Sequence, residues 1–146
     1  MTYEEYLRER GSLTCRMTGV SMLPLFREGR DVFTVRRKEP SERCRPGDVV
    51  LYRRPPGHYV LHRVIRVRDT DYVILGDNCV LRESGIRDGD ILGIMTGFIR
   101  KGKTHTVREI PYRLYSLLMV RMGWLRVFLK RCRLLAGRIV KKVIHA

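Results

Sequence analysis

The stretch "DVVLYRR", residues 48–54, is followed after four residues by "YVLHRVIRV", residues 59–67. Both stretches are short apolar runs of the kind that form β-strands, and Gly, Pro or Asp separates them from their neighbours. Pro55, Pro56 and Gly57 stand between them and favour a turn. The two stretches therefore predict strands that are joined by a turn.

The same texture of short apolar runs extends from Leu13 to Val107. Further strands are predicted at residues 31–37, 71–76 and 91–100, with connections that contain Gly, Pro or Asp. The runs follow one another too closely for helices to alternate with them, which favours an antiparallel or mixed sheet. The predicted fold class is therefore mainly β.

Helices are expected at both ends of this β region. Residues 2–10 carry helix formers, with Thr2 and Glu5 in a capping-box pattern and Gly11 at the end. These features define three parts: a short N-terminal helix within residues 1–12, a β domain over 13–110, and a helical segment over 111–146.

The helical segment has an amphipathic pattern. An apolar stripe recurs at three- and four-residue steps, and Gly123 and Gly137 are expected to divide the segment into two or three pieces. The stripe consists of Leu114, Leu118, Leu125, Leu129, Cys132, Ala136, Val140 and Val143.

The charge of the chain is strongly positive and uneven. Thirty Lys and Arg residues against fifteen Asp and Glu residues give a formal net charge of +15 over 146 residues. After Glu109 nine basic residues follow without any acidic one. This balance favours an anionic partner, either nucleic acid or an acidic lipid surface.

The four cysteines, Cys15, Cys44, Cys79 and Cys132, are too widely spaced to suggest a zinc site. Free thiols in a reducing compartment are the simpler interpretation, and neither a metal nor a cofactor is expected. The charged N-terminus shows no secretory signal, and no apolar run is long enough for a membrane span. A cytoplasmic or peripherally membrane-associated protein is therefore expected.

A single serine interrupts the apolar stretch "TGVSMLPLF", residues 18–26. Ser21, between Gly19 and Pro24, has two interpretations. It caps a turn, as serines in such sequences commonly do, or it is a nucleophile that needs a base from elsewhere in the chain. The stretch alone favours the first interpretation.

Four short segments in order favour the second. They are "GVSMLPLFREGR" (19–30), "RPGDVVLYRR" (45–54), "VLHRVIRV" (60–67) and "ILGDNCVL" (74–81). Their succession resembles the signal peptidase I superfamily, which includes the self-cleaving LexA-like repressors. The resemblance implies the β fold of that peptidase family, with Ser21 as nucleophile and His62 as general base.

A histidine at the position of the base is similar to the archaeal and endoplasmic-reticulum branch of the family, whereas its bacterial enzymes carry lysine. Neutral imidazole accepts a proton near neutral pH, while lysine must first be desolvated to lose its charge. Without the resemblance, His62 would be interpreted as a half-buried strand residue.

The acid that orients His62 stays open between three residues. Asp77 in the Gly-Asp-Asn segment is placed first, although that segment is also a good turn sequence; Asp90 and then Asp88 follow. The backbone N–H of Ser21 is expected to stabilise the oxyanion. Some family members carry a hydroxyl two residues before the serine, where this chain has Gly19.

The resemblance predicts a serine endopeptidase of signal-peptidase type that cleaves a leader or signal-like peptide, so a peptide or protein substrate is the expected partner. Two alternatives remain: a non-catalytic basic module that binds nucleic acid or anionic membrane, and a self-cleaving repressor-type relative. The helical segment likewise has two interpretations. Its apolar stripe packs on the β domain, or it lies on anionic lipid.

Overall fold

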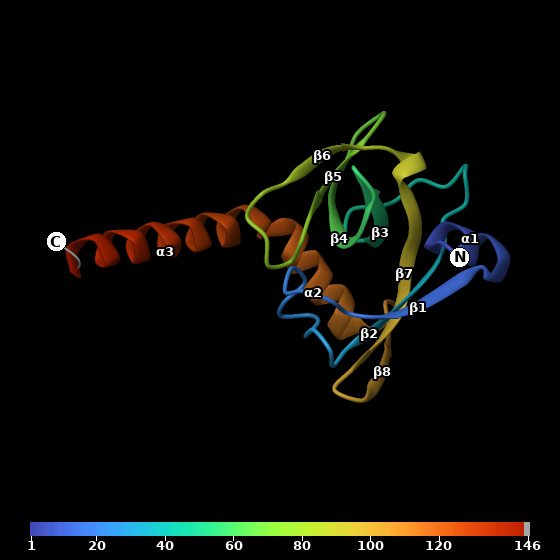
Figure 1. The fold of residues 1–146 in the computed structure, drawn as a ribbon, viewed down its shortest axis with the longest axis horizontal. Coiled ribbons are helices and arrows are strands. Elements are labelled where there is room, and N and C mark those ends of the chain that lie inside the picture. Colours follow the sequence, from blue (N-terminus) through green and yellow to red (C-terminus); the bar gives the residue numbers. More distant parts are fainter. Residues whose placement is uncertain (145–146) are drawn as a thin grey trace.

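One antiparallel sheet of eight strands makes up most of residues 12–106 (Figure 1). The structure is a computed structural model that describes residues 1–144. The spatial order is β1-β2-β7-β3-β4-β5-β6, and β8 pairs with the end of β7. The strands are β1 (Ser12–Arg16), β2 (Val32–Arg37), β3 (Val49–Arg54), β4 (His58–Val67), β5 (Tyr72–Leu75), β6 (Glu83–Ile86), β7 (Ile91–Arg100) and β8 (Lys103–Thr106). The expectation of a mainly β fold is therefore confirmed.

The middle of the sheet is buried on both faces. Along β3, Val49 and Leu51 belong to one hydrophobic cluster, whereas Val50 and Tyr52 belong to another. Since successive strand residues point to opposite faces, β3 is covered from two sides. The neighbouring strand β4, which carries His62, pairs with this buried strand and is positioned by it.

The N-terminal helix α1 (Tyr3–Arg10) has the predicted ends. The Thr2 hydroxyl accepts a hydrogen bond from the Glu5 N–H at 3.2 Å, and the Glu5 carboxylate accepts one from the Thr2 N–H at 2.7 Å. Gly11 follows with a φ of 76°, a left-handed conformation that favours glycine. The capping-box interpretation is confirmed.

Two helices follow the sheet, α2 (Ile110–Arg121) and α3 (Gly123–Ile144), and a single 3₁₀ turn, η1 (Asp88–Asp90), precedes β7. The predicted break at Gly123 is confirmed. Gly137 lies within the continuous helix α3, so the segment has two pieces, the smaller of the two numbers expected. Residues 145–146, the end of the predicted tail, lie outside the described residues.

The predicted apolar stripe does not pack on the sheet along α2. Leu114 and Leu118 are more than half exposed, whereas Tyr112 and Ser116 are buried. The reason is a buried arginine, described below, whose donors need polar partners. Beyond its first turns α3 extends away from the sheet (Figure 1). Within residues 1–144 no helix is both long and apolar enough to cross a bilayer.

Candidate active site

Ser21 lies in a turn that is anchored by its apolar neighbours. Met22, Leu25 and Phe26 are buried, while Ser21 is half-buried. Gly19 enters the turn with a φ of 73°, which a residue with a side chain rarely adopts. The backbone N–H of Ser21 has no hydrogen-bond partner within residues 1–144. That N–H is therefore free to bind an incoming oxygen.

Ser21 and His62 line the same cavity, of about 530 Å³. His62 lies on β4 opposite Val50 of β3 and is 4% exposed. Strand β1 and the residues after it supply another part of the wall, with Cys15, Met17 and Thr18. The topology therefore brings together the two residues that the sequence predicted as nucleophile and base.

Gly76 shows how closely the two segments approach. A Cβ atom added at Gly76 would lie 2.8 Å from the Ser21 carbonyl oxygen and 2.9 Å from His62 Nε2. It would also lie 2.6 Å from Cys79 Sγ. The absence of a side chain at Gly76 thus allows the Ser21 turn and the His62 ring to meet. A hydrogen bond between the Ser21 hydroxyl and His62 is not formed among residues 1–144, as is common before substrate binds.

The other ring nitrogen of His62 faces a carboxylate. Nδ1 lies 3.3 Å from Glu83 Oε1 and 3.3 Å from the Tyr52 hydroxyl oxygen. The Tyr52 hydroxyl itself donates to Glu83 Oε1 at 2.7 Å. A proton on Nδ1 would be held by these two acceptors, which leaves the lone pair of Nε2 directed toward the Ser21 turn.

The protonation states suit a base and its carboxylate. Burial lowers the pKa of His62 below its usual 6.5, and the Glu83 carboxylate offsets only part of this effect. Burial opposes ionisation of Glu83, but hydrogen bonds from Arg54 and Tyr52 outweigh it and hold the pKa of Glu83 below its usual value. At neutral pH the site therefore combines neutral imidazole with an ionised carboxylate.

Asp77, the first candidate for the orienting acid, is engaged elsewhere. Its Oδ1 accepts from Arg63 Nε and its Oδ2 from Arg63 Nη2, both at 2.8 Å. The Tyr115 hydroxyl also donates to Oδ2 at 2.8 Å. Both oxygens of Asp77 bind these donors, and no hydrogen bond joins Asp77 to His62 within residues 1–144. The carboxylate that lies beside Nδ1 is that of Glu83.

The two other candidate acids, Asp88 and Asp90, form their contacts with residues other than His62. Asp88 accepts from the Tyr72 hydroxyl at 2.6 Å and forms ion pairs with Lys38 and Arg43. Asp90 accepts from the Arg87 backbone N–H at 2.8 Å and so closes η1. Both residues thus bind groups in and around the loop before β7, and neither forms a hydrogen bond or ion pair with His62 within residues 1–144.

Glu83 was missed because no local pattern marks it. It lies at the start of the short strand β6 and reaches the site only because Ile74 of β5 pairs with it and Tyr52 of β3 bonds to it. The signal in the sequence is its position after the Gly-Asp-Asn segment, on the same side of that segment as Asp88 and Asp90.

The Gly-Asp-Asn segment has a second function in holding Ser21. The Asn78 N–H donates to the Ser21 carbonyl oxygen at 2.7 Å, and the Asn78 side-chain amide donates to the Val20 carbonyl oxygen at 3.0 Å. Lys130 of α3 in turn donates to the Asn78 carbonyl oxygen and, at 2.7 Å, to Asn78 Oδ1. The Ser21 turn is thus linked through Asn78 to α3.

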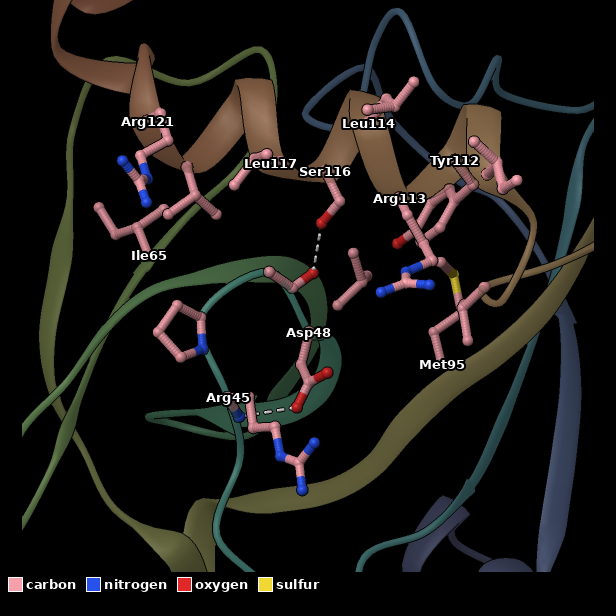
Figure 2. A pocket seen from close by; sticks show the side chains of 16 residues that line it. Arg45, Asp48, Ile65, Met95, Tyr112, Arg113, Leu114, Ser116, Leu117 and Arg121 are labelled. Carbon is pink, nitrogen blue, oxygen red and sulfur yellow. Dashed lines mark hydrogen bonds between the residues drawn. The ribbon is translucent and has the colours of Figure 1, made fainter.

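A larger cavity, of about 860 Å³, lies between α2 and the loop before β3 (Figure 2). Figure 2 shows Asp48 accepting from the Arg45 backbone, at 2.8 Å, beside apolar residues such as Ile65 and Met95. Ser21 and His62 do not line it. We assign the candidate active site to the smaller cavity, because Ser21 and His62 both line it and the Glu83 carboxylate lies beside Nδ1 of His62.

Comparison of the chain with protein-family models, curated proteins and solved structures gives no match. A serine hydroxyl, a buried neutral imidazole and a carboxylate behind it are the components of nucleophilic acyl transfer.

Proposed function

We propose that this chain is a serine endopeptidase of signal-peptidase type, which cleaves a leader or signal-like peptide with Ser21 as nucleophile and His62 as base. The observation that carries the proposal is the shared cavity of Ser21 and His62, with Nδ1 of His62 3.3 Å from Glu83. The order of the four sequence segments and the mainly β fold support it further.

In the proposed reaction, Ser21 Oγ attacks the peptide carbonyl carbon while its proton passes to His62 Nε2. The oxyanion accepts a hydrogen bond from the free N–H of Ser21. The C–N bond then breaks, and His62 gives the proton to the leaving amine. Water attacks the ester with Nε2 again as base, and the proton returns to Ser21 Oγ as the acid product leaves.

Glu83 is a positioning residue in this scheme. It does not contact the reacting atoms; it holds the Nδ1 proton and stabilises the imidazolium that forms during attack. Tyr52 assists, because burial and the neighbouring carboxylate raise its pKa and keep its hydroxyl protonated. The phenol therefore donates to Glu83 and keeps that carboxylate beside Nδ1.

The test is cleavage of a complex peptide mixture by the purified full chain, with products identified by mass spectrometry. Ser21→Ala and His62→Ala should each remove nearly all cleavage, and the double variant should be little worse because the two residues act as a unit. Ser12→Ala, in strand β1, is the matched control. Undiminished cleavage by Ser21→Ala would overturn the proposal.

A further inference from the structure

Helix α3 carries an apolar face that no other part of residues 1–144 covers. Trp124, Phe128, Leu135 and Ile139 recur at steps of four, seven and four residues, which places them on one side of a helix. All four side chains are more than half exposed. Every residue from 131 to 144 is exposed. Figure 1 shows this end of α3 projecting away from the sheet.

The side of α3 that faces the Gly-Asp-Asn segment is a different one. Val127 is buried, and Lys130 reaches Asn78 on the body. At 100° per residue these positions lie away from the side that carries Phe128 and Ile139. The exposed apolar face is therefore not the part of the helix that attaches α3 to the domain.

The charges on α3 specify what can cover this face. The helix carries seven basic residues and no acidic one: Arg126, Lys130, Arg131, Arg133, Arg138, Lys141 and Lys142. Arg131, Arg138 and Lys142 are spaced by seven and four residues and so follow one border of the apolar face. Such long basic side chains can reach headgroups while the apolar face enters the acyl boundary.

We propose that α3 binds in the plane of an anionic membrane, with Trp124, Phe128, Leu135 and Ile139 inserted and the basic side chains on lipid headgroups. A nucleic acid would satisfy the basic residues but leave the apolar face in water. An anionic lipid surface can cover the apolar face and also bind the basic side chains. The proposal goes beyond the peptidase activity and does not depend on it.

Co-sedimentation of the full chain with vesicles tests the proposal without any activity measurement. Binding to phosphatidylcholine vesicles that contain phosphatidylglycerol should be strong and should fall with salt, and binding to phosphatidylcholine alone should be weak. Phe128→Gln with Ile139→Gln should abolish binding, because glutamine keeps the helix but removes the apolar surface. Ile110→Gln, at an exposed apolar residue of α2, is the control.

A second pair of variants separates the helix from the net charge. Arg131→Gln, Arg138→Gln and Lys142→Gln together should weaken binding to anionic vesicles on the order of 100-fold. Arg8→Gln, Arg37→Gln and Arg66→Gln remove the same charge from exposed positions outside α3 and should have a much smaller effect.

Four results would overturn the proposal: equal binding to neutral and anionic vesicles, an equal loss of binding with both charge-removing sets, normal binding by the Phe128/Ile139 variant, or a dimer in solution that this variant converts to monomer. The last would mean that a second copy covers the face. A failure of the peptidase proposal would instead appear as cleavage that survives Ser21→Ala, with vesicle binding unchanged.

Discussion

Arg63 and Asp77 form a doubly hydrogen-bonded ion pair, 2.8 Å in each bond, with side chains 1% and 2% exposed. The remaining donor of the guanidinium, Nη1, reaches the Gly47 carbonyl oxygen and the Ser116 hydroxyl. One buried arginine therefore joins the strand of the base, the Gly-Asp-Asn segment and helix α2. The pair explains why α2 buries Tyr112 and Ser116 and not its leucines.

The first prediction concerns this pair. Asp77→Asn keeps the shape of the side chain but leaves the Arg63 charge buried without a counter-ion, so the free energy of unfolding should fall by about 3 kcal/mol. Urea denaturation measures it. Asp69→Asn, at an exposed loop position, should change stability by less than about 0.5 kcal/mol. If Asp77→Asn were as stable as the parent chain and lost only turnover, Asp77 would act on the chemistry.

The second prediction is the pH dependence of cleavage. Only neutral His62 can take the Ser21 proton, and burial lowers the pKa of His62. The rate of cleavage of the best peptide in the mixture should therefore rise with pH through a midpoint below 6.5 and then stay level to neutral pH. A midpoint above that value would show that Glu83 outweighs burial.

The third prediction separates Glu83 from Asp77 as the partner of His62. Glu83→Gln removes the charge that favours imidazolium, so the midpoint of the pH profile should move further down. The rate on the plateau should fall at least about 10-fold, because the imidazolium formed during attack loses its counter-charge. Glu28→Gln, at an exposed loop residue, should leave both the midpoint and the plateau in place. An unchanged midpoint in Glu83→Gln would contradict this assignment.

The sequence predicted the parts of this molecule that depend on local chemistry. Short apolar runs between turn residues predicted the strands around His62, and the Thr2–Glu5 pattern predicted the capped start of α1. Glu83 and the Arg63–Asp77 pair could not be found in this way, because each depends on which strands become neighbours. The apolar stripe predicted the wrong buried side of α2 for the same reason. The buried side carries Tyr112 and Ser116, which accept hydrogen bonds from Arg63, and the leucines are exposed.

The fourth prediction concerns Gly76. In Gly76→Ala the new Cβ would lie under 3 Å from Cys79 Sγ, the Ser21 carbonyl oxygen and His62 Nε2. The Ser21 oxygen belongs to the backbone and cannot rotate away, so either the turn or the histidine ring must move. Turnover should fall by at least about 100-fold, since a displacement of about 1 Å is enough to cost that much. Gly57→Ala, where no heavy atom lies within 4 Å of the added Cβ, should retain full turnover.

The last prediction tests whether α3 supports the site from outside the cavity. Lys130 donates to the carbonyl oxygen and side-chain oxygen of Asn78, and Asn78 holds the carbonyl oxygens of Val20 and Ser21. Lys130→Met keeps the aliphatic part of the side chain and removes the ammonium group. The hydrogen bonds from Asn78 to Ser21 and Val20 should therefore break more often. Hydrogen exchange of the Asn78 amide, which bonds to Ser21, should then quicken, and turnover should fall by a smaller factor than in Gly76→Ala.

Lys141→Met is the matched control for that variant, because Lys141 is exposed on the same helix far from the sheet. It removes the same charge, so a slower turnover in both variants would indicate a general effect of charge. Faster exchange at Asn78 in Lys130→Met alone would assign the effect to the contact between α3 and the Gly-Asp-Asn segment. Because the Asn78 N–H is the donor that holds the Ser21 carbonyl, unchanged exchange there would mean that the turn is held by its buried Met22 and Phe26 alone.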